Sequence, residues 1–300
     1  MKSITELLGI EYPILQGAMA HIARYPLASA VSEAGGLGII AAGGLSSEEL
    51  REQIRWTQER TKKPFAVNLM MQMDNISEQV EVLIEEGVKI VTTGAGTPKP
   101  YLERLKQADI KVFPVIPSVK LAQKMEQLGV DGIIAEGMEA GGHIGETTSM
   151  ALIPQVAQGV TIPVIAAGGI GDGRGMAAAF ALGAQGVQMG TAFLTVAECP
   201  IHENYQQAIL QADDTATIVL HKKSGGAVRA LRNSLADREE SPAAFSLEAL
   251  QQAADEGDTE KGIVMTGQIA GLFSEVKPAK VLIEEVYAEA AAICQNIKID

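Results

Sequence analysis

The sequence predicts a (β/α)8 barrel that carries one insertion. Eight short apolar runs occur at roughly even spacing, and helix-forming segments such as Ser46–Thr61 separate them. Alternating strand and helix patterns indicate successive βαβ units and a parallel sheet. The runs are apolar throughout, as expected for strands that are covered on both faces. A chain of 300 residues with 47% hydrophobic content is long enough to bury the core of such a barrel.

Each expected strand is an apolar run of residues that favour strands, and glycine, amide or hydroxyl residues follow it. In chain order the runs are Tyr12–Met19, Gly36–Gly44, Pro64–Met71, Lys89–Gly96, Lys111–Ser118, Gly132–Gly137, Pro163–Ile170 and Gly186–Phe193. An open dinucleotide-binding sheet is the alternative, but it needs G-x-G-x-x-G after the first strand. The richest glycine cluster here follows the seventh run, and no Walker A sequence is present. The barrel is therefore the favoured fold.

One connection is far longer than an ordinary barrel loop. We expect residues 1–198 and 263–300 to form the barrel, and residues 199–262 to form an inserted lid or small subdomain over the active face. The insertion contains a basic island, which could steer an acidic carrier protein or a nucleotide phosphate, or form a solvated face. Its members are Lys222, Lys223, Arg229 and Arg232.

Composition excludes several classes of partner. The net charge of −13 argues against nucleic acid, because no basic stripe is available to neutralise phosphates. No apolar run reaches ~18 residues and the N-terminus lacks a signal-peptide pattern, so we expect a cytoplasmic protein without a membrane partner. Two cysteines without metal-ligand spacing predict neither a disulfide framework nor a metal site. A homodimer is the default expectation for the oligomeric state.

In a barrel the carboxyl ends of all strands meet around one mouth. The residues at these ends are small, amide or hydroxyl types, which suit a planar heteroaromatic ligand and do not suit a metal ion; Glu136 is the only acid among them. The glycine loop with Gly168 and Gly169, followed by Gly190 and Thr191, forms a candidate phosphate cradle. We expect Asp172 in this loop to cap the following helix.

A phosphate site beside strand-end amides suggests FMN. Pyridoxal phosphate needs a lysine for its Schiff base, and no strand end carries one. Paired carboxylates for glycoside hydrolysis and a G-x-S-x-G nucleophile motif are also missing. His143 follows a glycine pair after the sixth run, where an imidazole could exchange a proton near neutral pH. His21 lies in the loop after the first strand, and we expect it at the surface.

Longer motifs resemble the FMN-dependent 2-nitropropane dioxygenase or nitronate monooxygenase superfamily. The resemblance rests on QGAMA, AGGLGII, VNLM, VTTGAG, MEAGGHIG, IPVIAAGGIGDG, VQMGTAF and MTGQIAGL, which extend from the first strand almost to the end of the chain. Within the superfamily, VTTGAG, MEAGGHIG and GGAVRALRN most resemble the flavoprotein enoyl-acyl-carrier-protein reductase II, the FabK type. Nitronate monooxygenases share the glycines and the histidine.

The resemblance implies an FMN-dependent enoyl thioester reductase of fatty-acid biosynthesis, with NADH or NADPH as co-substrate and His143 as the catalytic residue. An acyl carrier protein as partner and a monovalent cation are further possibilities that it implies. A nitronate monooxygenase that oxidises alkyl nitronates with O2 is the alternative. The candidate cofactor-binding residues are Gln16, Gly17, Met19, Asn68, Glu136, Gly141, Gly142, Gly168, Gly169, Gln188, Gly190, Thr191 and Gln268.

Overall fold

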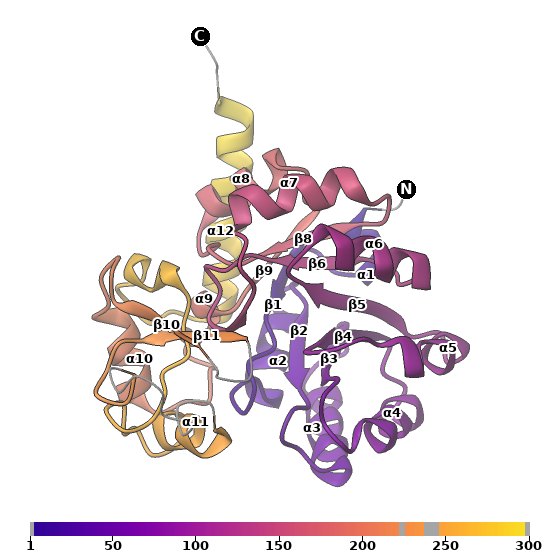
Figure 1. Ribbon diagram of the computed structural model, residues 1–300, viewed down its shortest axis with the longest axis horizontal. Coiled ribbons are helices and arrows are strands. Elements are labelled where there is room, and N and C mark those ends of the chain that lie inside the picture. Colours follow the sequence, from indigo (N-terminus) through magenta and orange to yellow (C-terminus); the bar gives the residue numbers. More distant parts are fainter. Residues whose placement is uncertain (1–2, 222–225, 237–245, 298–300) are drawn as a thin grey trace.

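The computed structural model describes residues 3–221, 226–236 and 246–297, and its centre is an eight-stranded parallel barrel (Figure 1). The strand order is β1-β9-β8-β6-β5-β4-β3-β2. The barrel strands are β1 (Ile14–Gln16), β2 (Gly38–Ala41), β3 (Phe65–Met70), β4 (Ile90–Gly94), β5 (Lys111–Ile116), β6 (Ile133–Glu136), β8 (Val164–Ala167) and β9 (Gly186–Met189). Each predicted run contains one of them, so the (β/α)8 barrel is confirmed.

Helices surround the barrel, and their starts follow local sequence signals. Ser3 and Ser46 form capping boxes with Glu6 and Glu49, and Asp172 accepts a hydrogen bond from the Gly175 N–H as predicted. The helices of the barrel part are α1 (Ile4–Leu8), α2 (Tyr25–Glu33), α3 (Ser47–Arg60), α4 (Ile76–Glu85), α5 (Lys99–Gln107), α6 (Val119–Leu128), α7 (Ser149–Gly159), α8 (Gly173–Ala181), α9 (Thr191–Leu194) and α12 (Ala279–Asn296).

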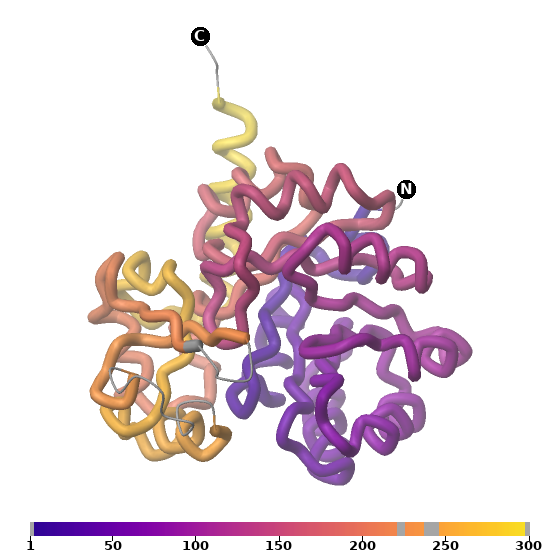
Figure 2. Tube along the Cα trace, in the orientation of Figure 1, coloured from indigo at the N-terminus to yellow at the C-terminus, as the bar shows by residue number. Residues whose placement is uncertain are grey.

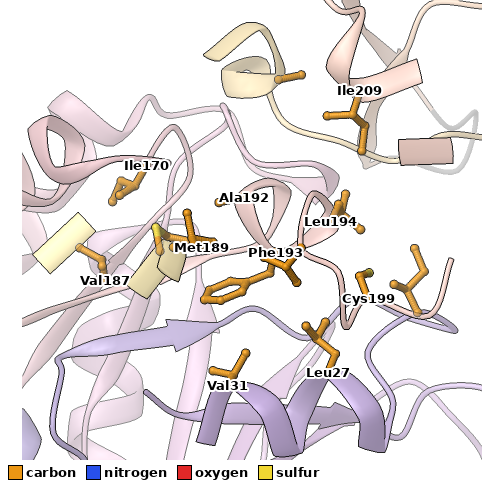
Figure 3. Packing of buried hydrophobic residues seen from close by; sticks show 14 of the residues in the cluster. Leu27, Val31, Ile170, Val187, Met189, Ala192, Phe193, Leu194, Cys199 and Ile209 are labelled. Carbon is orange, nitrogen blue, oxygen red and sulfur yellow. The ribbon is translucent and has the colours of Figure 1, made fainter. Parts of the chain in front are cut away.

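The core consists of one set of side chains inside the barrel and another between the strands and the helices. Inside, Leu15, Ile39, Phe113 and Ile165 share a buried cluster with Ile4 of α1, so α1 packs against the interior layer. Outside, the ring of Phe193 from α9 lies near Leu27 and Val31 of α2 in the largest cluster (Figure 3). Side chains of successive strand residues point to opposite faces, which explains how one continuously apolar run supplies both layers.

The barrel closes between β1 and β2 through a short contact. Only one parallel bridge, Leu15 to Leu37, is recorded between the two strands, whereas the other neighbouring strands form longer ladders. The side chain of Gln16 extends this contact, because its Oε1 accepts a hydrogen bond of 2.9 Å from the Ile39 N–H. Its Nε2 donates to the Gly17 carbonyl, and the residue is fully buried. A side-chain amide thus replaces a missing rung of the sheet.

The segment after β9 folds beside the barrel as the orange region of Figure 2. It contains α10 (Glu203–Leu210), β10 (Thr217–His221), β11 (Ala227–Leu231) and α11 (Leu247–Ala254), and the chain returns through the 3-10 helix η2 (Gln268–Leu272). A small sheet of order β10-β11-β7 joins this segment to β7 (Gly142–Ile144) from the barrel.

This inserted segment shares a core with the barrel. Val228 and Leu250 belong to the same buried cluster as Leu27 and Phe193. No helix in the described part of the chain combines the length and the apolar character that crossing a membrane requires.

The buried amide of Gln16 generates a stability prediction. In the Gln16→Met variant the Ile39 N–H loses its partner, so we expect the free energy of unfolding of the apoprotein to fall by about 1–3 kcal/mol. Urea denaturation of the apoprotein measures this change. Gln127→Met, on the exposed face of α6, is the matched control and should unfold like the parent protein. An unchanged midpoint for Gln16→Met would show that the closure does not depend on this side chain.

Candidate active site

A large cavity opens where the carboxyl ends of the barrel strands meet. Its volume is 640 Å³, within the usual range for a small-molecule site. Nine predicted site residues line it and are therefore brought together as expected from the barrel topology. They are Met19, Asn68, Glu136, Gly141, Gly142, His143, Gln188, Gly190 and Thr191.

His143 reaches this cavity from a strand of its own. The chain leaves β6, passes the glycine pair, and forms β7, which pairs antiparallel with β11 of the inserted segment. His143 stands opposite Val228 in this register, and its side chain is exposed at the cavity wall. Gly142 adopts a φ of +73°, in the left-handed region that favours glycine. The glycine before the histidine therefore makes the turn into β7 possible.

Amide and hydroxyl groups lie along the cavity wall. Asn68 on β3 donates a hydrogen bond of 2.9 Å to Thr92 Oγ1, which fixes the orientation of its amide. Gln188 on β9 is largely buried and lines the same space. Thr266 also lines it, and its buried Oγ1 has no hydrogen-bond partner among the described residues. A buried hydroxyl without a partner is costly, so a ligand atom that bonds to it would gain affinity.

Glu136 is the only acidic residue of the described cavity wall. It ends β6, is half-buried, and forms no hydrogen bond or ion pair with the described side chains. Burial disfavours the charged carboxylate and raises its pKa from 4.5 to about 7. Near neutral pH a large share of the molecules therefore carries an uncharged carboxyl group at this position.

Five predicted cofactor residues do not line the cavity. Gln16 is used in the barrel closure described above, and the Gly17 N–H donates a hydrogen bond of 2.8 Å to the Met189 carbonyl. Gly168 and Gly169 have φ values of +90° and +71° and lie beside the loop that leads to β7. Gln268 is exposed, and its N–H donates to the Glu139 carbonyl at 2.9 Å. The phosphate cradle at the glycine loop stays a prediction.

Two expectations about charged side chains need correction. The side chain of His21 is only 17% exposed, and its Nε2 lies 2.7 Å from Asp255 Oδ2 at the end of α11. His21 is therefore half-buried at the edge of the fold, where it links the barrel to the inserted segment. Arg229 is buried with 3% exposure, so it is not part of a solvated basic island. Lys222 and Lys223 lie outside the described residues.

Sequence reasoning missed several residues of the cavity wall. Leu250 of α11 and Met265 enter it from the inserted segment and the returning chain, and Lys124 of α6 is the only cation of the described wall. Thr266 stands within the MTGQIAGL motif, from which only Gln268 was selected. The motif could therefore have predicted Thr266 as a site residue. Leu250 and Lys124 lie in ordinary helix patterns, which do not mark them as site residues.

These residues fit the cofactor that the strand ends suggested. A Cβ atom added at Gly190 would meet only Met19 Sδ at 4.0 Å, so the backbone there borders open space that a flat ligand could fill. The amides of Asn68 and Gln188 and the unpartnered Thr266 hydroxyl offer hydrogen bonds suited to the polar edge of an isoalloxazine. The lining thus accommodates FMN by shape and by donor set.

The chain is similar to proteins of known family over nearly its whole length. The family model described as nitronate monooxygenase matches residues 1–79 and 73–289. The structure of FabK from Thermotoga maritima is 45% identical, covers 98% of both chains and superposes with a TM-score of 0.95.

Two curated relatives carry other names. A probable nitronate monooxygenase of Staphylococcus saprophyticus is 39% identical over 77% of this chain and 78% of its own. A (3aS,4S,5R,7aS)-5-hydroxy-7a-methyl-1-oxo-octahydro-1H-indene-4-carboxyl-CoA dehydrogenase of Mycobacterium tuberculosis is 33% identical over 98% and 97%.

The open space at Gly190 generates a binding prediction. Gly190→Ala places a methyl group in the cavity without backbone strain, since φ is −103°. We expect the dissociation constant for FMN to rise by at least ~10-fold, which corresponds to about 1.4 kcal/mol. Quenching of flavin fluorescence measures the constant. The melting temperature of the apoprotein is the control and should not change, and unaltered FMN affinity would place the cofactor elsewhere.

The raised pKa of Glu136 generates a pH prediction. Between pH 4.5 and 7 the folded protein retains a proton that the unfolded chain releases, so the stability of the apoprotein falls as the pH rises through this window. Glu136→Gln removes the titration. We expect the variant to exceed the parent in unfolding free energy by roughly 2–3 kcal/mol at pH 8 and to match it near pH 5.

Urea denaturation at the two pH values measures this difference. Glu59→Gln, an exposed carboxylate on α3, is the control and should not change it. An equal effect of Glu136→Gln at both pH values would contradict the assignment of the titration to this carboxyl.

Proposed function

Because the chain belongs to the nitronate monooxygenase family, we propose that this FMN-dependent oxidoreductase reduces trans-2-enoyl thioesters with NADH or NADPH. The observation that carries the proposal is the position of His143, whose imidazole faces a cavity with a largely apolar wall. Such a wall suits an acyl chain, and the imidazole suits proton transfer near neutral pH. The 45% identity with FabK over the full length supports the same reading.

Bound FMN would supply hydride transfer, taking a hydride from the nicotinamide and giving it to Cβ of the enoyl thioester. The chain must then supply one proton to Cα so that a saturated thioester leaves. We assign this step to His143, which lines the cavity and, because it is exposed, can regain a proton from solvent. Asn68, Gln188 and Thr266 would orient the cofactor through their amide and hydroxyl groups.

The carrier of the acyl group is part of the proposal. The name of the mycobacterial relative specifies a CoA thioester, which supports thioesters as the substrate class. The phosphate contact expected of the basic island is assigned instead to Lys124 at the cavity wall. Its ammonium group could contact a phosphate of the thioester arm or of the nucleotide. An acyl carrier protein remains the proposed partner, a homodimer the proposed assembly, and a monovalent cation a possible requirement.

A nitronate monooxygenase is the second candidate, favoured by the staphylococcal relative. The two candidates differ in their co-substrates, because the monooxygenase consumes oxygen with an alkyl nitronate and does not need NADH. The flavin absorbance of the purified protein therefore separates them. Under anaerobic conditions NADH or NADPH should bleach the flavin, and crotonyl-CoA should restore it. Oxygen uptake with propyl-2-nitronate, without crotonyl-CoA turnover, would instead establish the monooxygenase.

His143 generates a kinetic prediction. His143→Ala removes the proton donor, so we expect kcat for crotonyl-CoA reduction to fall by ~10²-fold or more. Steady-state oxidation of NADH under anaerobic conditions measures it. The matched control is His202→Ala, because His202 caps α10 and does not line the cavity. Undiminished turnover of His143→Ala would remove this residue from the mechanism.

A further inference from the structure

Arg229 is a buried cation that the proposed chemistry does not use. It lies on β11, only 3% exposed, and its guanidinium makes three hydrogen bonds. Nε and Nη2 both donate to the Met138 carbonyl, at 3.1 and 3.0 Å, and Nη1 donates to Thr217 Oγ1 at 3.1 Å. Burying a guanidinium is costly unless its donors are satisfied, and these three hydrogen bonds offset part of that cost.

The carbonyl that Arg229 holds begins the loop that carries His143. Met138 lies five residues before the histidine, and the Met138 N–H donates to the Thr147 carbonyl at 2.9 Å. The two ends of the loop are thereby joined. Arg229 also stands opposite Gly142 in the register between β11 and β7. The same residue therefore contacts the loop through its side chain at Met138 and through its backbone pairing next to His143.

The other hydrogen bonds of this loop are made by backbone groups or by the carboxylate of Glu139, which belongs to the loop itself. The Gln268 N–H donates to the Glu139 carbonyl, and the Glu139 carboxylate accepts hydrogen bonds from the Ser149 N–H and hydroxyl. The contact made by Arg229 comes from the inserted segment, and two of its three donors, Nε and Nη2, converge on the Met138 carbonyl oxygen. Two N–H groups of a rigid planar fork restrict the position of their shared acceptor more than a single donor can.

We propose that Arg229 is a positioning residue which, by clamping the Met138 carbonyl and pairing beside His143, holds the imidazole at the cavity wall. This inference rests on the proposed function, in which His143 supplies a proton to the substrate. The inserted segment then has a second task besides supplying Leu250 to the cavity wall, since its strand β11 carries the clamp. A displacement of the proton donor by about 1 Å can slow the proton transfer by ~10²-fold.

The two half-reactions separate this role from a purely structural one. Reduction of bound FMN by NADH needs no proton from His143, whereas reoxidation by crotonyl-CoA does. In Arg229→Met we expect stopped-flow reoxidation to slow by ~10- to 100-fold. The rate of flavin bleaching by NADH and the dissociation constant for FMN should stay within about twofold of the parent values. Arg229→Lys keeps the positive charge but replaces the planar fork by one ammonium nitrogen, and should recover part of the reoxidation rate.

Hydrogen exchange provides a readout that does not depend on activity. In the Arg229→Met apoprotein we expect amides in residues 138–147 to exchange at least ~10-fold faster, with the barrel strands unchanged. Arg55→Met, which removes an exposed guanidinium on α3, is the control and should leave both measurements unaltered.

The outcomes are distinguishable. Equal slowing of both half-reactions, or a loss of FMN affinity, would assign Arg229 a general structural role and overturn the proposal. Unchanged exchange in residues 138–147 would overturn it as well. If Arg229→Met does not fold, Arg229→Lys carries the same two measurements. If the parent protein shows no enoyl thioester turnover, the proposed function fails, and the exchange data still decide whether Arg229 holds the His143 loop.

Discussion

Closure of the barrel between β1 and β2 is the constraint on which the rest of the structure depends. Only a closed sheet brings the carboxyl ends of strands distant in sequence around one mouth, and an open edge would also leave backbone groups unpaired. The closure here is short, with one recorded bridge between Leu15 and Leu37 and the side chain of Gln16 bonded to the Ile39 N–H. The cavity residues that stand at the strand ends, such as Asn68 and Gln188, are brought together by this closure.

The inserted segment is part of the same folded unit. Its residues Val228 and Leu250 share a buried cluster with the helices of the barrel, and His21 pairs with Asp255 across the two parts. The strand that bears His143 pairs with β11 of this segment. The cavity therefore has a floor made by the barrel and a wall made partly by the insertion. Its geometry depends on how the two parts pack.

Few charged side chains line the cavity. Among the described wall residues only Lys124, Glu136 and His143 are titratable, and burial raises the pKa of Glu136 to about 7, so a large share of the molecules carries an uncharged carboxyl group near neutral pH. Arg229 is close by in the fold but directs its donors to a backbone carbonyl. A wall with so few charges suits an apolar acyl chain and a flat ring, and it offers two groups for proton transfer near pH 7, the imidazole of His143 and the carboxyl of Glu136.

The sequence by itself determined the features that depend on neighbouring residues. Continuous apolar runs separated by helix patterns predicted all eight strands, Asp172 caps α8 as expected, and strand-end positions such as Asn68 and Gln188 line the mouth. Tertiary structure alone decided the roles of Gln16, Arg229 and His21. Their partners lie 23, 91 and 234 residues away, at Ile39, Met138 and Asp255. Local patterns encode periodicity and capping, whereas a side chain's distant partner is set only when packing closes the chain upon itself.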